Sequence, residues 1–463
     1  MRFKRALAVA TAGALVAAGG IASVALTAGP ARAATITTVG LPFSTYSQML
    51  VDPVHQHLFI TSGPGSSSIL VTDYSGQTVA TIPGEPGATG LALSSDGSTV
   101  YAALANGDAV SAISTGTLTE TARYATGAGT DPAYVAYTSG KIWFSYVDGS
   151  SGAIGSIDPG TSPATVTLNA TNAAPGNWYG APELTASPAG DLVAGETGAA
   201  EPLNLASYDV SSGTATTLTP ETYFGNYQGL SGLQITPDGK DVVAATATSA
   251  PIFQVSDLSA AGEYPASGEG VSIASNGTVA TVAESGTNWD ALLFAPGGST
   301  PLETYSFGDK SLLGVALSPD ASELFTVGIY SISVAPPGIV TRHLVLNIVN
   351  DPGPVQGPST VSLAGPATVK HGQPLTLTGS LGGATPYTGG QVLQVTRTDS
   401  AEPDGVALPD VTTAADGSFT ITDTPPKLHA NKGTVTYQVS YAGDAYLTAS
   451  SATVSVAVTA GNG

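Results

Sequence analysis

A short residue pattern recurs seven times along the chain, and it constrains the fold more than any other feature. Each copy has an alternating apolar stretch, a tight polar turn and a second apolar stretch, as in ITPDGKDVVAAT at 235–246. The copies begin at Met49, Leu91, Val135, Leu184, Leu233, Val271 and Val315. Such a repeat indicates a modular architecture in which each unit buries an apolar side against its neighbour.

The turn in each copy has its own chemistry. At 235–246, Pro237 supplies the φ angle that the second position of a tight turn needs, and Gly239 can adopt positive φ. The corresponding positions are His55, Gly97, Gly140, Gly190, Gly239, Gly277 and Ala321. We expect a hairpin at each, with His accepted at positive φ. At Ala321 we expect a different turn type.

The spacing of the turns predicts the number of units. Successive turn positions lie 42, 43, 50, 49, 38 and 44 residues apart. A period near 44 with four short strands per unit is typical of β-propeller blades. Third and fourth strands are predicted at stretches such as SILVTDYSG from Ser68 and QTVATIPG from Gln77. We therefore predict an all-β chain whose residues 34–349 form a seven-bladed β-propeller.

These seven copies resemble the YVTN/NHL-type seven-bladed propellers, including the secreted YncE-like ones, over about two thirds of the chain. The resemblance implies the fold but no single function, because this scaffold hosts binders, lyases, lactonases and pure scaffolds. The lyase-like and lactonase-like members use His or metal-binding carboxylates that have no residue-by-residue match here. The catalytic residues therefore stay unknown.

Two segments compete to complete the last blade. ATITTVGLP at 34–42 has the pattern of a fourth strand, and HLVLNIV from His343 has the pattern of the final strand of the last copy. Both cannot hold the same place, so the sequence leaves the way in which the ring closes open.

The first 33 residues are predicted to be a secretory signal. MRFKR is basic, ALAVATAGALVAAGG is apolar, and Ala31-Arg32-Ala33 matches a small-x-small cleavage pattern. Removal is preferred over retention as a membrane anchor, because the apolar run is rich in Gly and Ala and is followed by the cleavage pattern. We expect a mature chain that starts at Ala34, is secreted, and is not inserted in a membrane. With no cysteine, it needs a large core in place of disulfides.

The composition changes at NDPGPVQGPS, and residues 350–358 are predicted to be a linker. Beyond it, residues 359–459 contain alternating strands at STVSLAG, PLTLTGS, QVLQVTR, SFTITDT, TVTYQVSYAG and ATVSVAV, which predict a β-sandwich. The segment from Thr436, with its turn at Tyr441, Gly443 and Asp444, resembles bacterial Ig-like repeat domains of secreted surface proteins. The resemblance implies a spacer or adhesive module rather than a catalytic domain.

The net charge of the mature chain restricts the partners that it can bind. Without the four basic residues of the leader, nine Lys and Arg face 34 Asp and Glu, a net charge of −25. A polyanion such as DNA or RNA would be repelled, and an anionic membrane surface is disfavoured for the same reason. Acidity also keeps a secreted protein soluble, which explains the charge without any ligand.

The residue inventory limits catalysis. There is no cysteine nucleophile and there are five histidines, of which His55 and His57 lie at the first hairpin turn without a close acidic or His partner in sequence. We predict no metal site and no cofactor, although Ca²⁺ at acidic loops stays open without a contiguous motif. A carboxylate pair for glycoside hydrolysis stays open too. Its candidates near predicted loops are Glu183, Glu196, Glu269, Glu284, Asp131, Asp148 and Asp290.

Aromatic residues gather in the two longest repeats. NATNAAPGNWYGAPE from Asn169 and PETYFGNYQGLSG from Pro220 are predicted to be loops between blades, and ESGTNWD lies on the same predicted face. The candidate ligand-binding residues are Trp178, Tyr179, Tyr223, Phe224, Tyr227 and Trp289. Exposed rings beside Asn and acids suit sugar stacking with hydrogen bonds to hydroxyls. Alternatively, the long loops fold back and bury these rings. Trp143, within KIWFSYV, is expected in the core.

Two functional classes follow. The first is a secreted, non-enzymatic binding or scaffold protein, a monomer whose propeller face recognises an extracellular polysaccharide or a cell-surface protein. The second is a secreted carbohydrate-active hydrolase or lyase with a carboxylate pair in the propeller pocket. We favour the first, because spacing alone selects no acid pair.

Overall fold

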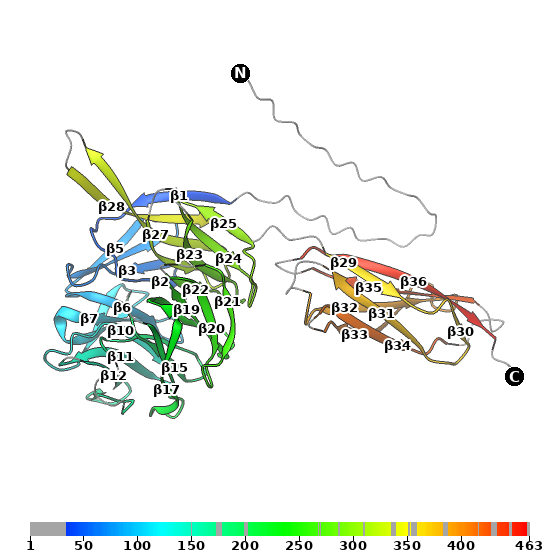
Figure 1. The fold of residues 1–463 in the computed structure, drawn as a ribbon, viewed down its shortest axis with the longest axis horizontal. Coiled ribbons are helices and arrows are strands. Elements are labelled where there is room, and N and C mark those ends of the chain that lie inside the picture. Colours follow the sequence, from blue (N-terminus) through cyan, green and yellow to red (C-terminus); the bar gives the residue numbers. More distant parts are fainter. Residues whose placement is uncertain are drawn as a thin grey trace, which may run out of the picture.

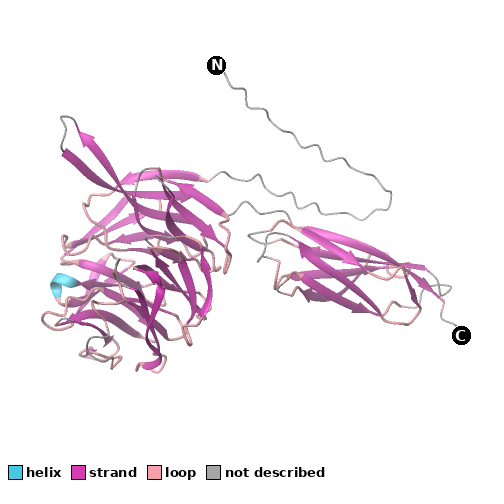
Figure 2. Ribbon diagram, viewed as in Figure 1, coloured by secondary structure: helices cyan, strands magenta, loops and turns pink. Residues whose placement is uncertain are grey.

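Seven four-stranded antiparallel sheets and a separate pair of sheets make up the protein in this computed structural model (Figures 1 and 2). The structure describes residues 34–460 apart from 150, 173–177, 199–201, 267, 269, 286–287, 309–310, 335–338, 351, 353–358, 383–387, 415, 427–432 and 444–446. No helix in this described part is long and apolar enough to cross a membrane.

The seven four-stranded sheets follow the repeats. The first is β2 (Met49–Asp52), β3 (His57–Ile60), β4 (Ser68–Asp73) and β5 (Thr78–Pro83). The second is β6 (Ala88–Leu93), β7 (Thr99–Leu104), β8 (Ala109–Ser114) and β9 (Thr119–Ala125), with the short 3-10 helix η1 (Ala105–Gly107) after β7. The third is β10 (Tyr134–Thr138), β11 (Lys141–Asp148), β12 (Ser151–Asp158) and β13 (Thr165–Thr167).

The remaining four sheets continue the order. The fourth is β14 (Glu183–Ala186), β15 (Asp191–Gly195), β16 (Pro202–Asp209) and β17 (Thr216–Gln228). The fifth is β18 (Leu230–Ile235), β19 (Asp241–Thr246), β20 (Ala250–Gln254) and β21 (Ala260–Tyr264). The sixth is β22 (Val271–Ile273), β23 (Val279–Ser285), β24 (Asn288–Phe294) and β25 (Glu303–Ser306). The seventh is β26 (Ser311–Leu317), β27 (Glu323–Val334), β28 (Ile339–Asn350) and β1 (Thr35–Gly40).

The first strands of the seven sheets form a closed ring. Each contacts the first strand of the next sheet, in the order β2, β6, β10, β14, β18, β22 and β26, and β26 contacts β2 again. In Figure 1 the chain colours accordingly run around a central axis. The prediction of an all-β, seven-bladed β-propeller is confirmed.

The core of the propeller is divided into seven apolar layers, each between two adjacent blades. One layer, for example, joins Phe59 of blade 1 to Val100 of blade 2, and another joins Trp143 of blade 3 to Leu192 of blade 4. The second and third strands are buried on both faces because a blade lies on either side of each sheet. Trp143 is in the core, as expected.

Most turn predictions hold in detail. Positive φ occurs at all five predicted glycines, for example 75° at Gly239. At Asp96, hydrogen bonds from Ser94 and Ser98 lower the pKa to about 2. The Asp96 carboxylate therefore has a structural role within its own turn.

Two turns differ from expectation. In the first blade positive φ falls on Gln56, at 55°, rather than on His55. Here the buried Asp52 carboxylate accepts hydrogen bonds from the Val54 and His55 backbones. Ala321 has a φ of 58° in the same turn type as the glycines, and its N–H donates to Ser318 O at 2.8 Å as that of Gly239 donates to Thr236 O. The prediction of another turn type there was wrong, since these bonds hold the strained angle.

The ring closes by pairing the two ends of the propeller. β28 is the third strand of blade 7 and β1 is its fourth, so both candidate segments have a place. The antiparallel register runs from Thr35 opposite Asn350 to Gly40 opposite Val345. In Figure 1, β1 in blue lies along β28 in yellow, and the far part of the β27–β28 hairpin projects beyond the ring.

The C-terminal part is a sandwich of two sheets around one apolar core. One sheet comprises β29 (Thr360–Ala364), β31 (Leu375–Gly382) and β34 (Ser418–Asp423). The other comprises β30 (Thr368–Lys370), β36 (Ser450–Thr459), β35 (Gly433–Tyr441), β32 (Val392–Thr398) and β33 (Val406–Thr412). β30 and β33 were not predicted. Asp423 joins the sheets, since it pairs with Arg397 at 3.0 Å and accepts a hydrogen bond from the Tyr437 hydroxyl at 2.7 Å.

Replacement of Asn347 tests the closure. Its buried amide accepts a hydrogen bond from Thr38 of β1 at 2.8 Å and donates one to Thr326 at 3.1 Å. N347A should lower the free energy of unfolding by about 1–3 kcal/mol, because two hydroxyls lose a buried partner. Asn350 is the matched control, since it bonds Thr35 of the same strand at an exposed position. N350A should change stability by less than about 0.5 kcal/mol. Equal losses in urea unfolding would contradict the closure described here.

Candidate functional site

The two aromatic segments predicted as loops have different structures. Residues 168–182 do connect blades, between β13 and β14. Residues 220–228, in contrast, belong to β17, a 13-residue outer strand of blade 4, and only Gly229 separates it from β18. The prediction of a second long inter-blade loop was wrong, because the chain extends the fourth strand instead.

Trp178 is a core residue. Its side chain is 1% exposed and packs with Trp143 of blade 3 and Leu192 of blade 4. Its carbonyl accepts a hydrogen bond from Gly152 N at 2.9 Å, which fixes the loop across blade 3. Gly152 is required there, since a Cβ atom would lie 1.7 Å from Gly180 O. The expectation of an exposed ring at Trp178 was wrong, and the burial that we held as the alternative applies to this residue.

The next residue, Tyr179, is 69% exposed. Its backbone is held rigidly, because the buried Glu196 carboxylate accepts hydrogen bonds from Tyr179 N at 2.9 Å and from Gly180 N at 3.1 Å. One acid therefore anchors the loop to blade 4 while the Tyr179 ring faces solvent.

The three aromatic residues of β17 divide between its two faces. Phe224 and Tyr227 are half-buried and pack on Phe253 of blade 5, with ring centroids 4.4 and 6.1 Å from it. Tyr223 points to the other face and is 55% exposed. Of the predicted residues in β17, Tyr223 alone therefore presents a largely exposed ring.

Tyr179 and Tyr223 lie on the same side of blade 4. Tyr223 is paired with Asn204 of β16, whose carbonyl accepts a hydrogen bond from Glu196 N. Glu196 holds Tyr179 in turn. Directly paired residues point to one face of a sheet, so Tyr223 and the Glu196-bound loop share the face toward blade 3. Two strand spacings, about 10 Å, separate Glu196 from Tyr223.

Between them lies a buried amide that sequence reasoning missed. Asn204 is 0% exposed, and neither its Oδ1 nor its Nδ2 has a hydrogen-bond partner in the described part of the chain. Asn204 shares one face of β16 with Ala206 and Tyr208, which pack in the same layer as Trp178. Among the described residues, the Trp178 indole nitrogen has no hydrogen-bond partner either. Buried polar groups of this kind usually bind water in folded proteins.

Trp289 lies on β24, opposite Glu284 of β23. The side chains of both residues, and all of Glu269, fall outside the described residues. Among the other candidate acids, Asp131 and Asp148 are exposed and Asp290 is half-buried.

Glu183 is the acid at the centre of the ring. It begins the innermost strand of blade 4, and its Oε1 accepts a hydrogen bond from Leu233 N of blade 5 at 3.0 Å. Burial raises the pKa of Glu183 to about 7, although the bond from Leu233 lowers it. Burial also raises the pKa of Tyr134 to about 12, and the Glu183 charge adds to this effect. The Glu183 carboxylate and the Tyr134 hydroxyl are therefore close enough to influence each other electrostatically.

Gln48 occupies the same position in blade 1. Its uncharged side chain likewise accepts a hydrogen bond from the next blade. Gln48 Oε1 accepts a hydrogen bond from Leu91 N of blade 2 at 2.6 Å, and Leu91 corresponds to Leu233. Glu183 is thus a bridge between adjacent inner strands. Since Glu183 and Glu196 both bind backbone N–H groups, neither is positioned as a free member of a carboxylate pair.

The histidine pair is also accounted for by the turn. The expectation that His55 has no acidic partner close in sequence was wrong, since its Nδ1 lies 2.8 Å from Oδ2 of Asp52. The His55 ring stacks on His57 with centroids 5.8 Å apart. Within the described residues, no group of three or more His, Asp or Glu side chains is arranged to hold a metal ion.

Comparison with known proteins does not assign the chain to a family. No protein-family model and no curated protein matches the chain. Among solved structures, hydrazine synthase of Kuenenia stuttgartiensis is similar with 14% identity and a TM-score of 0.46, covering 62% of this chain and 94% of that chain. The Cps50 (Swd1) β-propeller domain of Myceliophteria thermophila is similar with 11% identity and a TM-score of 0.48, covering 67% and 99%.

Substitution of Trp178 tests its assignment to the core. W178A should lower the free energy of unfolding by about 3–5 kcal/mol, because it leaves a cavity between blades 3 and 4. W178F should cost less, since most of the ring volume remains and the lost indole N–H has no described partner. Y179A is the matched control and should stay within about 0.5 kcal/mol. Denaturant unfolding measures all three, and a mild W178A would contradict the burial.

Glu183 should make stability fall as pH rises. Its pKa is raised in the folded state, so the folded chain binds more protons than the unfolded chain between about pH 4.5 and 7. Above pH 7 the ionised, buried carboxylate costs at most about 3 kcal/mol. E183Q should therefore be more stable than the wild type at pH 8 and equal to it near pH 4.5. The reciprocal Q48E should be less stable than the wild type at pH 8 only. A pH-independent difference in urea unfolding would refute this.

Proposed function

We propose that this is a secreted, non-enzymatic binding protein that recognises a neutral extracellular polysaccharide on the side of the propeller where the β13–β14 connection joins blades 3 and 4. The observation that carries the proposal is the pair of exposed tyrosine rings, Tyr179 and Tyr223, on one side of blade 4. Both rings sit on fixed backbone, one held by Glu196 and the other within a β-strand. A rigid aromatic pair binds with little loss of conformational entropy.

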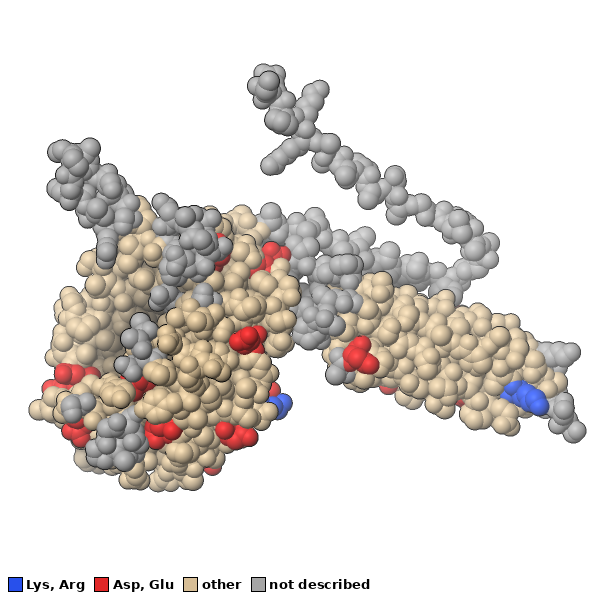
Figure 3. Space-filling view, viewed as in Figure 1, with Lys and Arg blue, Asp and Glu red and all other residues tan. Residues whose placement is uncertain are grey.

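The chemistry of this surface suits sugars. Tyrosine rings stack on the apolar faces of pyranose rings, and their hydroxyls bond to sugar hydroxyls. Two separate exposed rings on one side of blade 4 suit a chain of sugar units rather than a single one. A neutral glycan is favoured over a uronic or sulfated one, since the mature chain carries a net charge of −25. Figure 3 shows acidic groups spread over one face of the propeller and few basic ones.

Secretion and the role of the C-terminal domain are part of the same proposal. The basic and apolar start of the chain and its cleavage pattern support export. The repeat resembles YVTN/NHL propellers, and the Thr436 segment resembles bacterial Ig-like repeats, which supports a sandwich that acts as a spacer or adhesive module. The absence of cysteine agrees with a core held by apolar packing alone.

The alternative, a glycan-cleaving enzyme, has less support. It requires two carboxylates that flank a substrate bond. Glu183 bridges two inner strands and Glu196 anchors a loop, so each has a structural task. Binding without cleavage is therefore the function that these side chains support best.

Replacement of the two tyrosines tests the proposal. Y179A/Y223A should lower the retention of the mature protein on neutral cell-wall or plant polysaccharides at least tenfold, because both stacking surfaces are lost. Y179F/Y223F keeps the rings and should retain most of the affinity. Retention is measured by affinity electrophoresis on a polysaccharide panel, with reducing-end release recorded in the same samples.

The control is V54A, which removes an exposed apolar side chain at a turn of blade 1, on the opposite side of the propeller. It should bind as the wild type does. Equal retention of the double alanine variant and the wild type, with unchanged melting, would remove the proposed surface. Release of new reducing ends would instead support the enzymatic alternative.

A further inference from the structure

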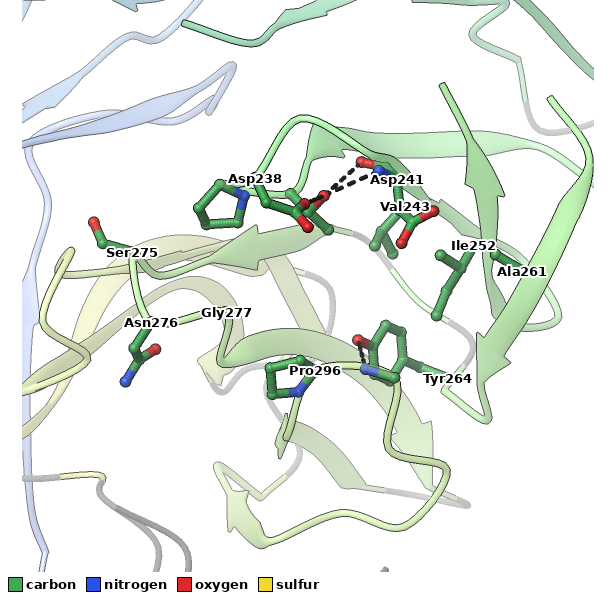
Figure 4. A pocket seen from close by; sticks show the side chains of 13 residues that line it. Asp238, Asp241, Val243, Ile252, Ala261, Tyr264, Ser275, Asn276, Gly277 and Pro296 are labelled. Atoms are coloured by element: carbon green, nitrogen blue, oxygen red, sulfur yellow. Dashed lines mark hydrogen bonds between the residues drawn. The ribbon is translucent and has the colours of Figure 1, made fainter. Parts of the chain in front are cut away.

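A cleft between blades 5 and 6 opens on the opposite side of the propeller from the tyrosines. Its volume is about 330 Å³. Its lining includes Asp241, Val243, Ile252, Ala261, Tyr264 and Pro296. Figure 4 shows these side chains around an open space, with Asp241 and Val243 on one side and Pro296 and Tyr264 on the other. This volume is at the lower end of the range for small-molecule sites.

The cleft exists because the outer strand of blade 5 has small side chains. β21 reads AAGEY, and Ala260, Ala261 and Gly262 leave space where other blades carry larger residues. The floor is apolar and rigid: Val243, Ile252 and Tyr264 are all buried in the layer between the two blades. The Tyr264 hydroxyl is fixed by a hydrogen bond from Gly297 N at 2.8 Å. The shape is therefore preformed.

Asp241 at the rim differs from its equivalents in other blades. In blade 4 the Asp191 carboxylate accepts a hydrogen bond from the Ser187 hydroxyl at 2.7 Å, and in blade 7 Glu323 accepts one from Ser322. In blade 5 the Thr236 hydroxyl bonds Asp238 and the Asp241 backbone instead. The Asp241 carboxylate thus accepts no hydrogen bond from any residue that the structure describes. Burial raises the pKa of Asp241, and the nearby Asp238 charge raises it further.

The neighbouring lysine, Lys240, already pairs with another acid. Lys240 Nζ lies 3.0 Å from Asp238 Oδ2, so this pair is neutral overall. Among the residues that the structure describes, the Asp241 carboxylate has no ion pair of its own, and it lies beside an apolar floor. Within a strongly acidic protein, such a charge attracts a cation.

We propose that the cleft between blades 5 and 6 binds a small organic ammonium ion, with the ammonium group on the Asp241 carboxylate and the carbon body against Val243, Ile252 and Tyr264. The ammonium supplies the donors and the charge that Asp241 lacks, and the apolar body removes the floor from water. An inorganic cation would leave the apolar floor exposed to water. A neutral apolar molecule would give the Asp241 carboxylate neither a hydrogen-bond donor nor a positive charge. This site is independent of the tyrosine surface.

Binding of benzylammonium to the mature protein tests the proposal, with neutral benzyl alcohol as the isosteric comparison. Titration calorimetry at low ionic strength and pH 7.5 should show saturable binding of benzylammonium, and at least tenfold weaker binding of benzyl alcohol. D241N should weaken benzylammonium binding at least tenfold. D209N removes an equal charge at an exposed turn of blade 4, away from the cleft, and should bind as the wild type does. A261L should block binding, since it fills the cleft while retaining all charges.

A tripeptide with a central lysine distinguishes a free amine from the side chain of a partner protein. Tighter binding of benzylammonium than of the peptide supports a small-molecule ligand, and the reverse order would overturn that assignment. The proposal also fails if the wild type shows no saturable binding of benzylammonium, or if D241N and D209N bind it equally. Melting temperatures of the variants, expected within a few degrees of the wild type, separate loss of binding from loss of folding.

Discussion

Burial of both faces of each sheet against its two neighbours holds the propeller together, and the rest of the structure depends on it. The chain has no disulfide, so the seven apolar layers between blades supply the cohesion. A ring of this kind is stable only when it is closed, because an open end would expose one apolar sheet face. The apolar layer between blades 7 and 1 covers that face, and the pairing of β1 with β28 holds the two ends of the propeller together. The buried Asn347 amide, bonded to Thr38, adds a polar contact that favours this one register.

Close approach of the innermost strands imposes a second requirement. Their inner edges have no further strand to pair with, so side chains of the neighbouring blade satisfy their N–H groups. Gln48, Glu183 and Ser272 each accept such a bond. This gives the acid with a raised pKa at the centre of the ring, Glu183, a structural role. The departures from the repeat, such as the long β17 and the small residues of β21, lie away from this ring, where variation costs less.

The same repeat therefore produces two unlike surfaces. On one side, blade 4 extends its outer strand and receives the Glu196-anchored loop, which presents Tyr179 and Tyr223 to solvent. On the other side, the outer strand of blade 5, β21, has small side chains, and this leaves the cleft beside Asp241. A neutral aromatic surface and an acidic apolar cleft select different ligands. Tyr223 lies on a β-strand, Tyr179 lies on the Glu196-bound loop, and Val243 and Ile252 of the cleft lie on β-strands.

The sequence by itself determined the blade number, the hairpins and the positions of most turns, because these depend on alternation and turn residues that are neighbours in the chain. It misjudged Ala321 and Trp178 and left the closure undecided. The angle at Ala321 depends on bonds across its turn, and the burial of Trp178 depends on blade 4. The closure joins residues more than three hundred positions apart. Tertiary structure alone decided which tyrosines are exposed and which carboxylates are satisfied, since both depend on packing between blades.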